Sequence, residues 1–301
     1  MTRHGAGTVV CVILNWNGWQ DTLACLDALV LTDWPDLHIL VIDNASTNDS
    51  VARIRDALPR LGAGVELIES AENGGFASGC NLGIRVALER GADLVWLLNN
   101  DTVAPADTLR KLCAGMREPS IGMVGTVLRY AHDPATTQAW GGGSIVRWLG
   151  FNRHFVQPTP LDDASYLTFA SVLIRTELLR TTGLLDEGFF MYFEDADLCF
   201  RARRIGWRFC IAEDTAVLHR EGGSGERFPS LRADRVITTS GLRFLHRHGK
   251  PARVAQVLFV LSRLVKRLLR ADVARTRAVL AGAAAWMRQP KAARAIQGGR
   301  A

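Results

Sequence analysis

The chain has 301 residues, of which 48% are hydrophobic and 22% are charged. This composition is typical of a globular protein with one large or two ordinary domains, and it excludes a disordered, collagen-like or disulfide-scaffold chain. No apolar run reaches the roughly 18 residues of a standard transmembrane helix. The six cysteines form no C-x-x-C pair, and the apolar run at residues 8–14 fits a buried strand better than a secretory signal. We therefore expect a protein of the reducing cytoplasm.

The net charge of +6 conceals an uneven distribution along the chain. Residues 1–240 hold 22 Lys and Arg against 29 Asp and Glu, whereas residues 241–301 hold 14 Lys and Arg against the single acid Asp272. A strongly basic segment behind a mildly acidic body predicts an anionic partner for the tail, either a nucleic acid or a membrane surface.

The first 100 residues alternate between strand-like and helix-like segments, which predicts an α/β fold with a parallel sheet covered by helices on both faces. Residues 120–170 are less regular and predict a lobe of short strands and loops. Apolar runs predict strands at residues 8–14, 37–42, 65–68 and 93–98. Helical spacing and stop signals predict helices at residues 21–30, 51–58 (ending near Pro59), 77–90 (ending at Gly91), 195–206 and 229–248.

Polar residues follow three of the predicted strands, at residues 15–18 (NWNG), 43–46 (DNAS) and 99–101 (NND). These positions share one edge of a parallel sheet, where ligands bind. Such residues also cap helices and form turns, but three clusters together, two of them with acids, favour a site. The glycine-rich loop at residues 73–79 (NGGFASG) has amides that can hold phosphate, although it is neither a dinucleotide fingerprint nor a P-loop.

Acidic side chains gather at residues 193–197 (FEDAD). Glu194 and Asp195 follow an aromatic run, and an apolar wall raises the pKa of a carboxyl and suits it to act as a general base. Asp197 stands four residues before Arg201, the spacing of a structural ion pair on a helix. Asp101 and His219 can supply oxygen and nitrogen ligands to a divalent metal, but a lone histidine is more often structural, and spacing alone does not show that the two meet.

Six segments, taken together and in order, resemble the inverting family 2 glycosyltransferases of the GT-A fold, most closely the bacterial rhamnosyltransferase-like branch. The segments are residues 12–18, 41–46, 73–81, 97–102, 184–201 and 219–224. The resemblance implies a Rossmann-like, mostly parallel sheet flanked by helices, followed by a basic, amphipathic helical tail. It implies a catalytic domain over residues 1–240, with a nucleotide-sugar-binding half (1–118) and an acceptor and catalytic half (119–240), and a tail over residues 241–301.

The same resemblance implies roles for individual residues. The catalytic residues would be Asp195, as base, and Glu194 beside it. Mg²⁺ or Mn²⁺ would be bound by Asp101 and His219, with Asn99 in place of the first acid of the family's D-x-D motif. The donor would contact Asn15, Asn17, Asp43, Asn44, Asn73, Gly75, Asn81, Asn99 and Asn100. The acceptor side would include Trp140, Gly142, Gly143 and Phe169, the last at a position where relatives usually carry glycine, so that its ring should narrow the acceptor cleft.

By analogy, the expected reaction is transfer of L-rhamnose from dTDP-rhamnose, with inversion, to a hydroxyl of a glycan or lipid-linked acceptor in cell-surface polysaccharide synthesis. One alternative is a nucleotidyltransferase that forms sugar nucleotides, but that class carries a Gly-rich, Arg- or Lys-bearing loop where this chain has NWNG. Another is a non-catalytic lipid- or nucleic-acid-binding protein. The acidic body and the lack of interleaved basic and aromatic residues argue against nucleic acid.

Residues 253–270 predict one amphipathic helix with an apolar stripe opposite Arg263, Lys266, Arg267 and Arg270. A central arginine costs on the order of 3 kcal/mol in a bilayer, so we expect residues 251–270 to lie on an anionic membrane surface and not to span it. The chain would then be cytoplasmic and peripheral on the inner face of the plasma membrane. Alternatively, the stripe packs on the catalytic domain or on another subunit of a homo-oligomer, with the charges solvated.

Overall fold

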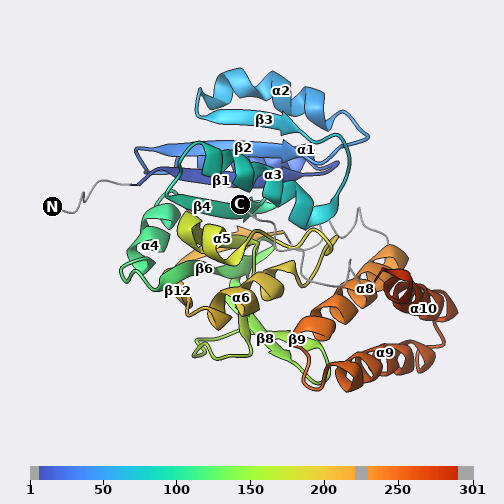
Figure 1. Cartoon of the computed structure of the whole chain (residues 1–301). Coiled ribbons are helices and arrows are strands. Elements are labelled where there is room, and N and C mark those ends of the chain that lie inside the picture. The colour runs from blue at the N-terminus through green and yellow to red at the C-terminus, as the bar shows by residue number, and fades with distance from the viewer. Residues whose placement is uncertain (1–6, 221–229, 291–301) are drawn as a thin grey trace.

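The computed structural model describes residues 7–220 and 230–290. It shows a mixed α/β fold in which one large twisted sheet carries helices on its faces and three further helices follow at the C-terminal end (Figure 1). The sheet has nine strands in the order β3-β2-β1-β4-β11-β6-β12-β5, with β7 paired to β6. Within the described residues, every helix is too short or too polar to cross a bilayer.

The first half of the sheet is parallel, as the sequence predicts. Its core strands are shielded from solvent on both faces, which explains their continuous apolar runs. Helix α2 corrects one prediction: it continues through Pro59 to Leu61, since Ile54, Ala57 and Leu61 pack into the core on one face. The elements are β1 (Val9–Asn15), α1 (Trp19–Leu29), β2 (Leu37–Asp43), α2 (Ser50–Leu61), β3 (Val65–Glu69), α3 (Gly75–Glu89) and β4 (Leu94–Asn99).

The second half of the sheet is mixed, because β11 runs antiparallel to both β4 and β6 while β12 runs parallel to β6. Strand β12 then pairs with the short β5, which places His219 opposite Thr102. The elements are β5 (Thr102–Val103), α4 (Thr108–Gly115), β6 (Ile121–Tyr130), β7 (Asp133–Trp140), β11 (Ser171–Arg175), α5 (Thr176–Thr182), α6 (Glu194–Arg204) and β12 (Arg208–His219). A separate small sheet contains β8 (Gly142–Val146), β9 (Phe151–His154) and β10 (Ser165–Leu167).

The C-terminal helices are α8 (Ser230–His248), α9 (Ala252–Leu268) and α10 (Val273–Arg288). The buried carboxylate of Asp234 on α8 binds Arg263 and Arg267 of α9 and Arg275 of α10, so one acid ties the three helices together. The domain division proposed at residue 240 falls inside α8. Helix α10 was not predicted, because its Ala- and Arg-rich sequence has no clear apolar stripe. Predictions for residues 221–229 and 291–301 lie outside the described part of the chain.

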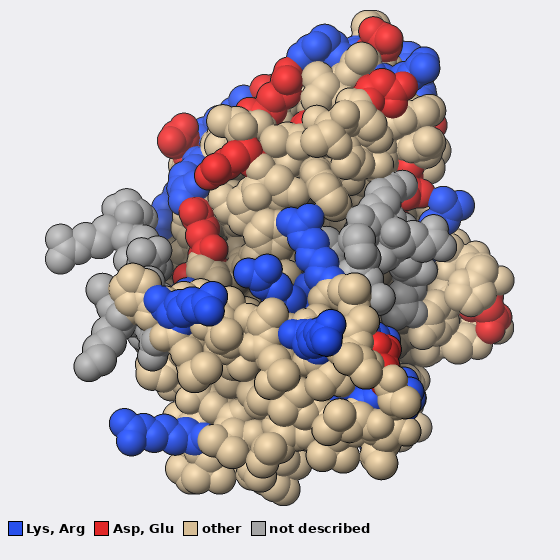
Figure 2. Space-filling view, turned by 90° about the vertical axis from the view of Figure 1, so that its right-hand side faces the viewer, with Lys and Arg blue, Asp and Glu red and all other residues tan. Residues whose placement is uncertain are grey.

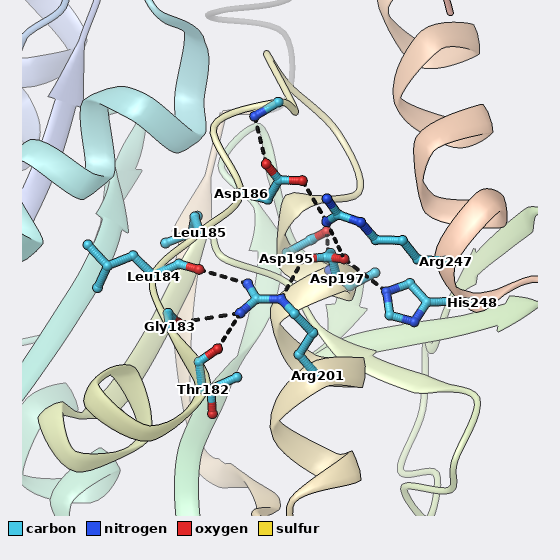
Figure 3. Close-up of polar contacts among 12 residues, drawn as sticks. Thr182, Gly183, Leu184, Leu185, Asp186, Asp195, Asp197, Arg201, Arg247 and His248 are labelled. Atoms are coloured by element: carbon cyan, nitrogen blue, oxygen red, sulfur yellow. Dashed lines mark hydrogen bonds and ion pairs between the residues drawn. The ribbon is translucent and has the colours of Figure 1, made fainter. Parts of the chain in front are cut away.

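A buried ionic cluster joins α8 to the catalytic half (Figure 3). Asp197 is completely buried and binds Arg201 (Nε–Oδ2 2.8 Å), Arg247 (Nη1–Oδ1 3.2 Å) and His248 (Nε2–Oδ1 2.9 Å). The predicted ion pair of Asp197 with Arg201 is therefore confirmed. Burial alone would raise the pKa of Asp197, but the hydrogen bond from His248 and the charges of the two arginines outweigh burial and hold this pKa well below its usual range.

We expect Asp197→Asn to lower the free energy of unfolding by about 3–5 kcal/mol at neutral pH, because it leaves buried cations without their counter-charge. The difference from wild type should shrink as the pH falls below about 4, where the unfolded chain binds its protons. Urea unfolding followed by circular dichroism measures both. The matched control is Asp49→Asn, which breaks an exposed Asp–Arg pair at the same i,i+4 spacing and should lower the free energy of unfolding far less. Equal losses in the two variants would contradict the assignment.

Candidate active site

A cavity of about 650 Å³ lies between the first half (residues 9–103) and the second half (residues 121–219) of the α/β fold and reaches the C-terminal helices. It is lined from the first half by the ends of β1 and β4 and the loops after β2 and β3, and from the second half by the small sheet, residues 168–170 and residues 190–196. Asp101, His219 and Asp195 all line it, which confirms that these three residues converge on one space. The other predicted site residues in the lining are Asn44, Asn73, Gly75, Asn99, Asn100, Phe169 and Glu194.

Asp101 and His219 form a buried pair on one wall of the cavity. The Nε2 atom of His219 lies 3.2 Å from Oδ1 of Asp101, and its Nδ1 lies 2.7 Å from Oε1 of Gln138 on β7. An amide oxygen only accepts hydrogen bonds, so Gln138 fixes the tautomer in which Nδ1 carries the proton and Nε2 presents its lone pair. Asn99 stands beside the pair, with its Nδ2 atom 3.5 Å from the histidine Nε2.

This donor set fits a divalent cation held partly by substrate. Among the described residues there is no group of three or more His, Cys, Asp or Glu side chains that could hold a metal alone. Mg²⁺ typically binds through one or two protein ligands while phosphates and water complete its coordination. A carboxylate oxygen and a correctly oriented imidazole nitrogen, facing a cavity with room for a diphosphate, match that requirement.

Glu194 and Asp195 open helix α6 behind two residues with strained backbones. Tyr192 and Phe193 have φ values of 70° and 71°, a left-handed conformation that costs bulky residues of order 1–2 kcal/mol each and that turns the chain sharply into the helix. Burial raises the pKa of Asp195 to about 7. Burial, followed by the charge of Asp195, raises the pKa of Glu194 well above its usual value. Burial thus raises the pKa of both carboxyls, as the aromatic run that precedes them in the sequence predicts.

The loops after β1 and β2 are hydrogen-bonded to each other, and Asn15, Asn17 and Asp43 do not line the cavity. Asp43 is buried and accepts hydrogen bonds from Asn15 Nδ2 (2.6 Å), Ser46 N (2.9 Å) and Ser46 Oγ (2.6 Å). Asn17 is similarly engaged, with its Oδ1 accepting from Thr47 N at 2.8 Å. Asn15, Asn17 and Asp43 therefore hold the two loops in shape, and their contact with the donor stays a prediction.

Asn44 is the polar side chain of this loop that lines the cavity. Its Nδ2 atom donates to Asn73 Oδ1 (3.0 Å) and to the carbonyl of Gly75 (3.1 Å), and no described residue bonds its buried Oδ1. Asn73 Oδ1 also accepts from Gly75 N at 3.0 Å. Asn44 is thus held by its amide nitrogen, with an acceptor oxygen left for a ligand.

The glycine-rich loop differs from the phosphate cradle that its sequence suggested. The amides of Gly74, Gly75 and Phe76 donate to Glu72 O, Asn73 Oδ1 and Phe190 O, so these three do not face a ligand. Gly75 instead permits a close approach, since a Cβ there would lie 2.0 Å from the carbonyl oxygen of Phe190. The loop therefore braces the aromatic segment that leads to Asp195.

Four other predicted site residues lie outside the cavity lining. Asn81 joins α3 to the loop before α6 through bonds to the backbone N and O of Leu185. Gly142 and Gly143 allow the small sheet to pack, because a Cβ at either would lie 1.9 or 2.3 Å from a neighbouring carbonyl oxygen. Trp140 donates from Nε1 to Glu213 at 3.3 Å. In contrast, Phe169 is buried and lines the cavity, where its ring takes up space as expected.

Sequence reasoning missed several lining residues. Trp16 stands within the NWNG segment and was visible there, whereas His154 and Tyr166 belong to irregular strands that give no local signal. Phe259 and Arg263 of α9 also line the cavity, so the tail contributes to the site. The sequence analysis assigned no role to Phe259 and placed Arg263 only on the charged face of the amphipathic helix.

Comparison with known proteins identifies the family. The family model "Glycosyltransferase like family 2" matches residues 6–233, well over half of the chain. The chain therefore belongs to glycosyltransferase family 2, and the resemblance seen in the motifs is confirmed.

Relatives with named activities are distant in sequence. The chain is 29% identical over 231 residues to the galactofuranosyltransferase GlfT1 of Mycobacterium tuberculosis, covering 74% of this chain and 73% of that one. It is 24% identical to the N-acetylglucosaminyl-diphospho-decaprenol L-rhamnosyltransferase of the same organism, over 68% and 73% of the chains. It is 25% identical to the low-salt glycan biosynthesis hexosyltransferase Agl10 of Haloferax volcanii, but that alignment spans only 55% of either protein.

Solved structures support the fold. The mannosyltransferase PcManGT of Pyrobaculum calidifontis, in complex with GDP-Man and Mn²⁺, superposes with a TM-score of 0.56 at 18% identity, covering 97% of this chain and 81% of that one. At this identity the likeness shows the fold alone. It agrees with the GT-A class and the helical C-terminal segment expected from the sequence.

The pairing of Asp101 with His219 leads to a prediction about metal binding. We expect His219→Ala to weaken Mn²⁺ binding in the presence of a nucleoside diphosphate at least tenfold, and Gln138→Leu to weaken it by about tenfold, because the glutamine only orients the ring. Isothermal titration calorimetry measures both. His154→Ala removes another histidine of the same cavity and should leave the affinity unchanged. Wild-type affinity in His219→Ala would reject the assignment.

Proposed function

We propose that the chain is an inverting, metal-dependent glycosyltransferase that moves a sugar from a nucleotide-sugar donor to a hydroxyl of a glycan or lipid-linked acceptor. The observation that carries this proposal is the convergence of a candidate base, Asp195, and a candidate metal pair, Asp101 and His219, on one cavity. A single displacement requires both a base and a group that binds the diphosphate within one space.

In this proposal Asp195 removes the proton of the acceptor hydroxyl as the bond to the sugar forms. An alcohol is a weak nucleophile until a base takes its proton, and a carboxyl with a pKa of about 7 is well matched to that task near neutral pH. Burial and the neighbouring charge of Asp195 raise the pKa of Glu194, so the two adjacent carboxyls disfavour being charged at the same time. One displacement inverts the anomeric carbon and needs no covalent intermediate.

On the donor side, Asp101 and His219 would hold Mg²⁺ or Mn²⁺, with the histidine oriented by Gln138. The bound cation supplies positive charge that stabilises the departing nucleoside diphosphate. The unpaired Oδ1 of Asn44 is placed to accept an N–H of the nucleotide, a role that the sequence assigned to Asp43. Asn99 and Asn100 line the same cavity and would contact the sugar and diphosphate.

For the substrates we propose L-rhamnose from dTDP-rhamnose and a lipid-linked acceptor in cell-surface polysaccharide synthesis. The proposal is supported by the named rhamnosyltransferase relative, whose acceptor is a diphospho-decaprenol. Galactofuranose is the competing sugar, since GlfT1 is a galactofuranosyltransferase. The broad cavity suits a long acceptor better than free water or a small alcohol.

We expect Asp195→Asn to reduce transfer by about 10²–10⁴-fold while nucleotide affinity stays near that of wild type. In wild type, kcat/KM should rise with pH around 7, because the carboxyl must lose its proton before it can accept one. Steady-state kinetics over a pH series and calorimetry with the nucleotide measure the two effects. Asp163→Asn removes an exposed acid and should change neither. Full turnover by Asp195→Asn would exclude this residue as the base.

A donor screen tests the function itself. Purified protein is incubated with dTDP-, UDP- and GDP-sugars and a lipid-linked acceptor extract, and release of nucleoside diphosphate is measured with and without chelator. We expect release with dTDP-rhamnose that the chelator prevents. Release with UDP-galactofuranose alone would correct the sugar, and no release with any donor would overturn the proposal. Formation of a sugar nucleotide in a parallel incubation with a nucleoside triphosphate and a sugar 1-phosphate would indicate a nucleotidyltransferase.

A further inference from the structure

Helix α9 has an inner face that is held firmly against the rest of the protein. Ala255 and Phe259 are buried, and Arg263 and Arg267 point inward, where both bind the carboxylate of Asp234. Arg263 also donates from Nε to Thr238 Oγ1 at 3.1 Å. These contacts fix the rotation of α9 about its own axis, with two of its arginines on the protein side.

The opposite face of α9 is apolar and exposed. Its residues recur at helical spacing, and each has at least half of its surface in contact with solvent: Val254 (50%), Val257 (58%), Leu261 (51%), Val265 (52%), Leu268 (63%) and Leu269 (83%). An apolar row of this length on a soluble protein marks an interaction surface. The exposed row argues against the alternative in which the stripe packs on the catalytic domain, and the burial of Arg263 and Arg267 shows that these two charges are not solvated.

The charges around this exposed row are positive. Asp272 is the single acid in residues 241–301. In a view onto the C-terminal helices, the acidic side chains gather over the upper half of the molecule, and the lower half is largely uncharged with Lys and Arg around it (Figure 2). The exposed cations of this region are Lys250, Arg253, Lys266, Arg270, Arg277 and Arg288.

We propose that this face of α9 docks on an anionic lipid bilayer, with the apolar row inserted among the lipid chains and Arg253 and Lys266 on the lipid headgroups. On a helical wheel at 100° per residue, Arg253 and Lys266 fall just beyond the two edges of the apolar row. The long side chains of Arg253 and Lys266 can reach the lipid phosphates while the apolar row between them is buried among the lipid chains. A protein partner would need no such flanking pair of cations.

Docking of α9 would also orient the cavity, a consequence that rests on the proposed function. Phe259 and Arg263 line the cavity from the inner face of the helix whose outer face would contact lipid. The turn between β8 and β9 packs on Phe259 through Gly150, and this turn exposes the rings of Trp148 and Phe151. Phe151 lines the cavity as well, so one helix and one turn connect the membrane surface to the site of transfer.

The test compares two double variants of the full chain by flotation with vesicles. Val257→Glu/Leu261→Glu places charges in the apolar row, and Val30→Glu/Leu31→Glu places the same charges at an exposed Val–Leu pair after α1. We expect wild type and the control to float with phosphatidylglycerol–phosphatidylcholine vesicles and not with phosphatidylcholine alone. The α9 variant should bind at least tenfold more weakly. Equal flotation of both variants, or no flotation of wild type, would overturn the proposal.

Three further measurements complete the test. Circular dichroism melting of both variants establishes that they are folded. Light scattering identifies the main rival occupant, because a wild-type dimer that the α9 variant abolishes would assign this face to a second copy of the chain. Asp195→Asn should float like wild type, so a failure of the proposed chemistry and a failure of membrane docking give different results.

Discussion

The carboxylate of Asp197 connects three parts of the molecule that are separate in the sequence. It lies on α6, pairs with Arg201 on the same helix, and binds Arg247 and His248 from α8. Arg201 in turn donates to the carbonyls of Thr182 and Leu184. Because an unpaired buried charge is far more costly than a paired one, these groups must be buried together or not at all. The first turn of α6, which carries Asp195, is therefore fixed to α8 and to the segment before it.

A second buried acid repeats this arrangement at the C-terminal end. Asp234 on α8 gathers arginines from α9 and α10, just as Asp197 gathers cations from α8. Ionic contacts thus link α6, which carries the candidate base, to α8 and α8 to the helix with the exposed apolar row. A cavity wall made from α9 can then keep a fixed relation to Asp195, although the two are more than sixty residues apart in sequence.

The parts of this structure that were predictable from the sequence depend on local patterns. Continuous apolar runs gave the four parallel strands, and i,i+4 spacing gave the pair of Asp197 with Arg201. Pairing between distant segments leaves no local trace, so neither the contact of His219 with Gln138 nor the meeting of β12 with β5 could be derived. In the loop after β2, the polar cluster predicts a site. It does not predict that the side chain of Asp43 is buried within the loop while that of Asn44 lines the cavity.

Helix α9 shows most clearly what periodicity does and does not determine. The sequence defines two faces, and in water the apolar face is expected to turn inward. Here Asp234 attracts the arginines inward, although burial opposes their charge and lowers the pKa of Arg263 to about 10. An inward cationic face and an outward apolar face are both unfavourable for a helix surrounded by water. The same orientation is favourable for a helix whose outer side contacts lipid hydrocarbon, because the exposed apolar side chains are then removed from water.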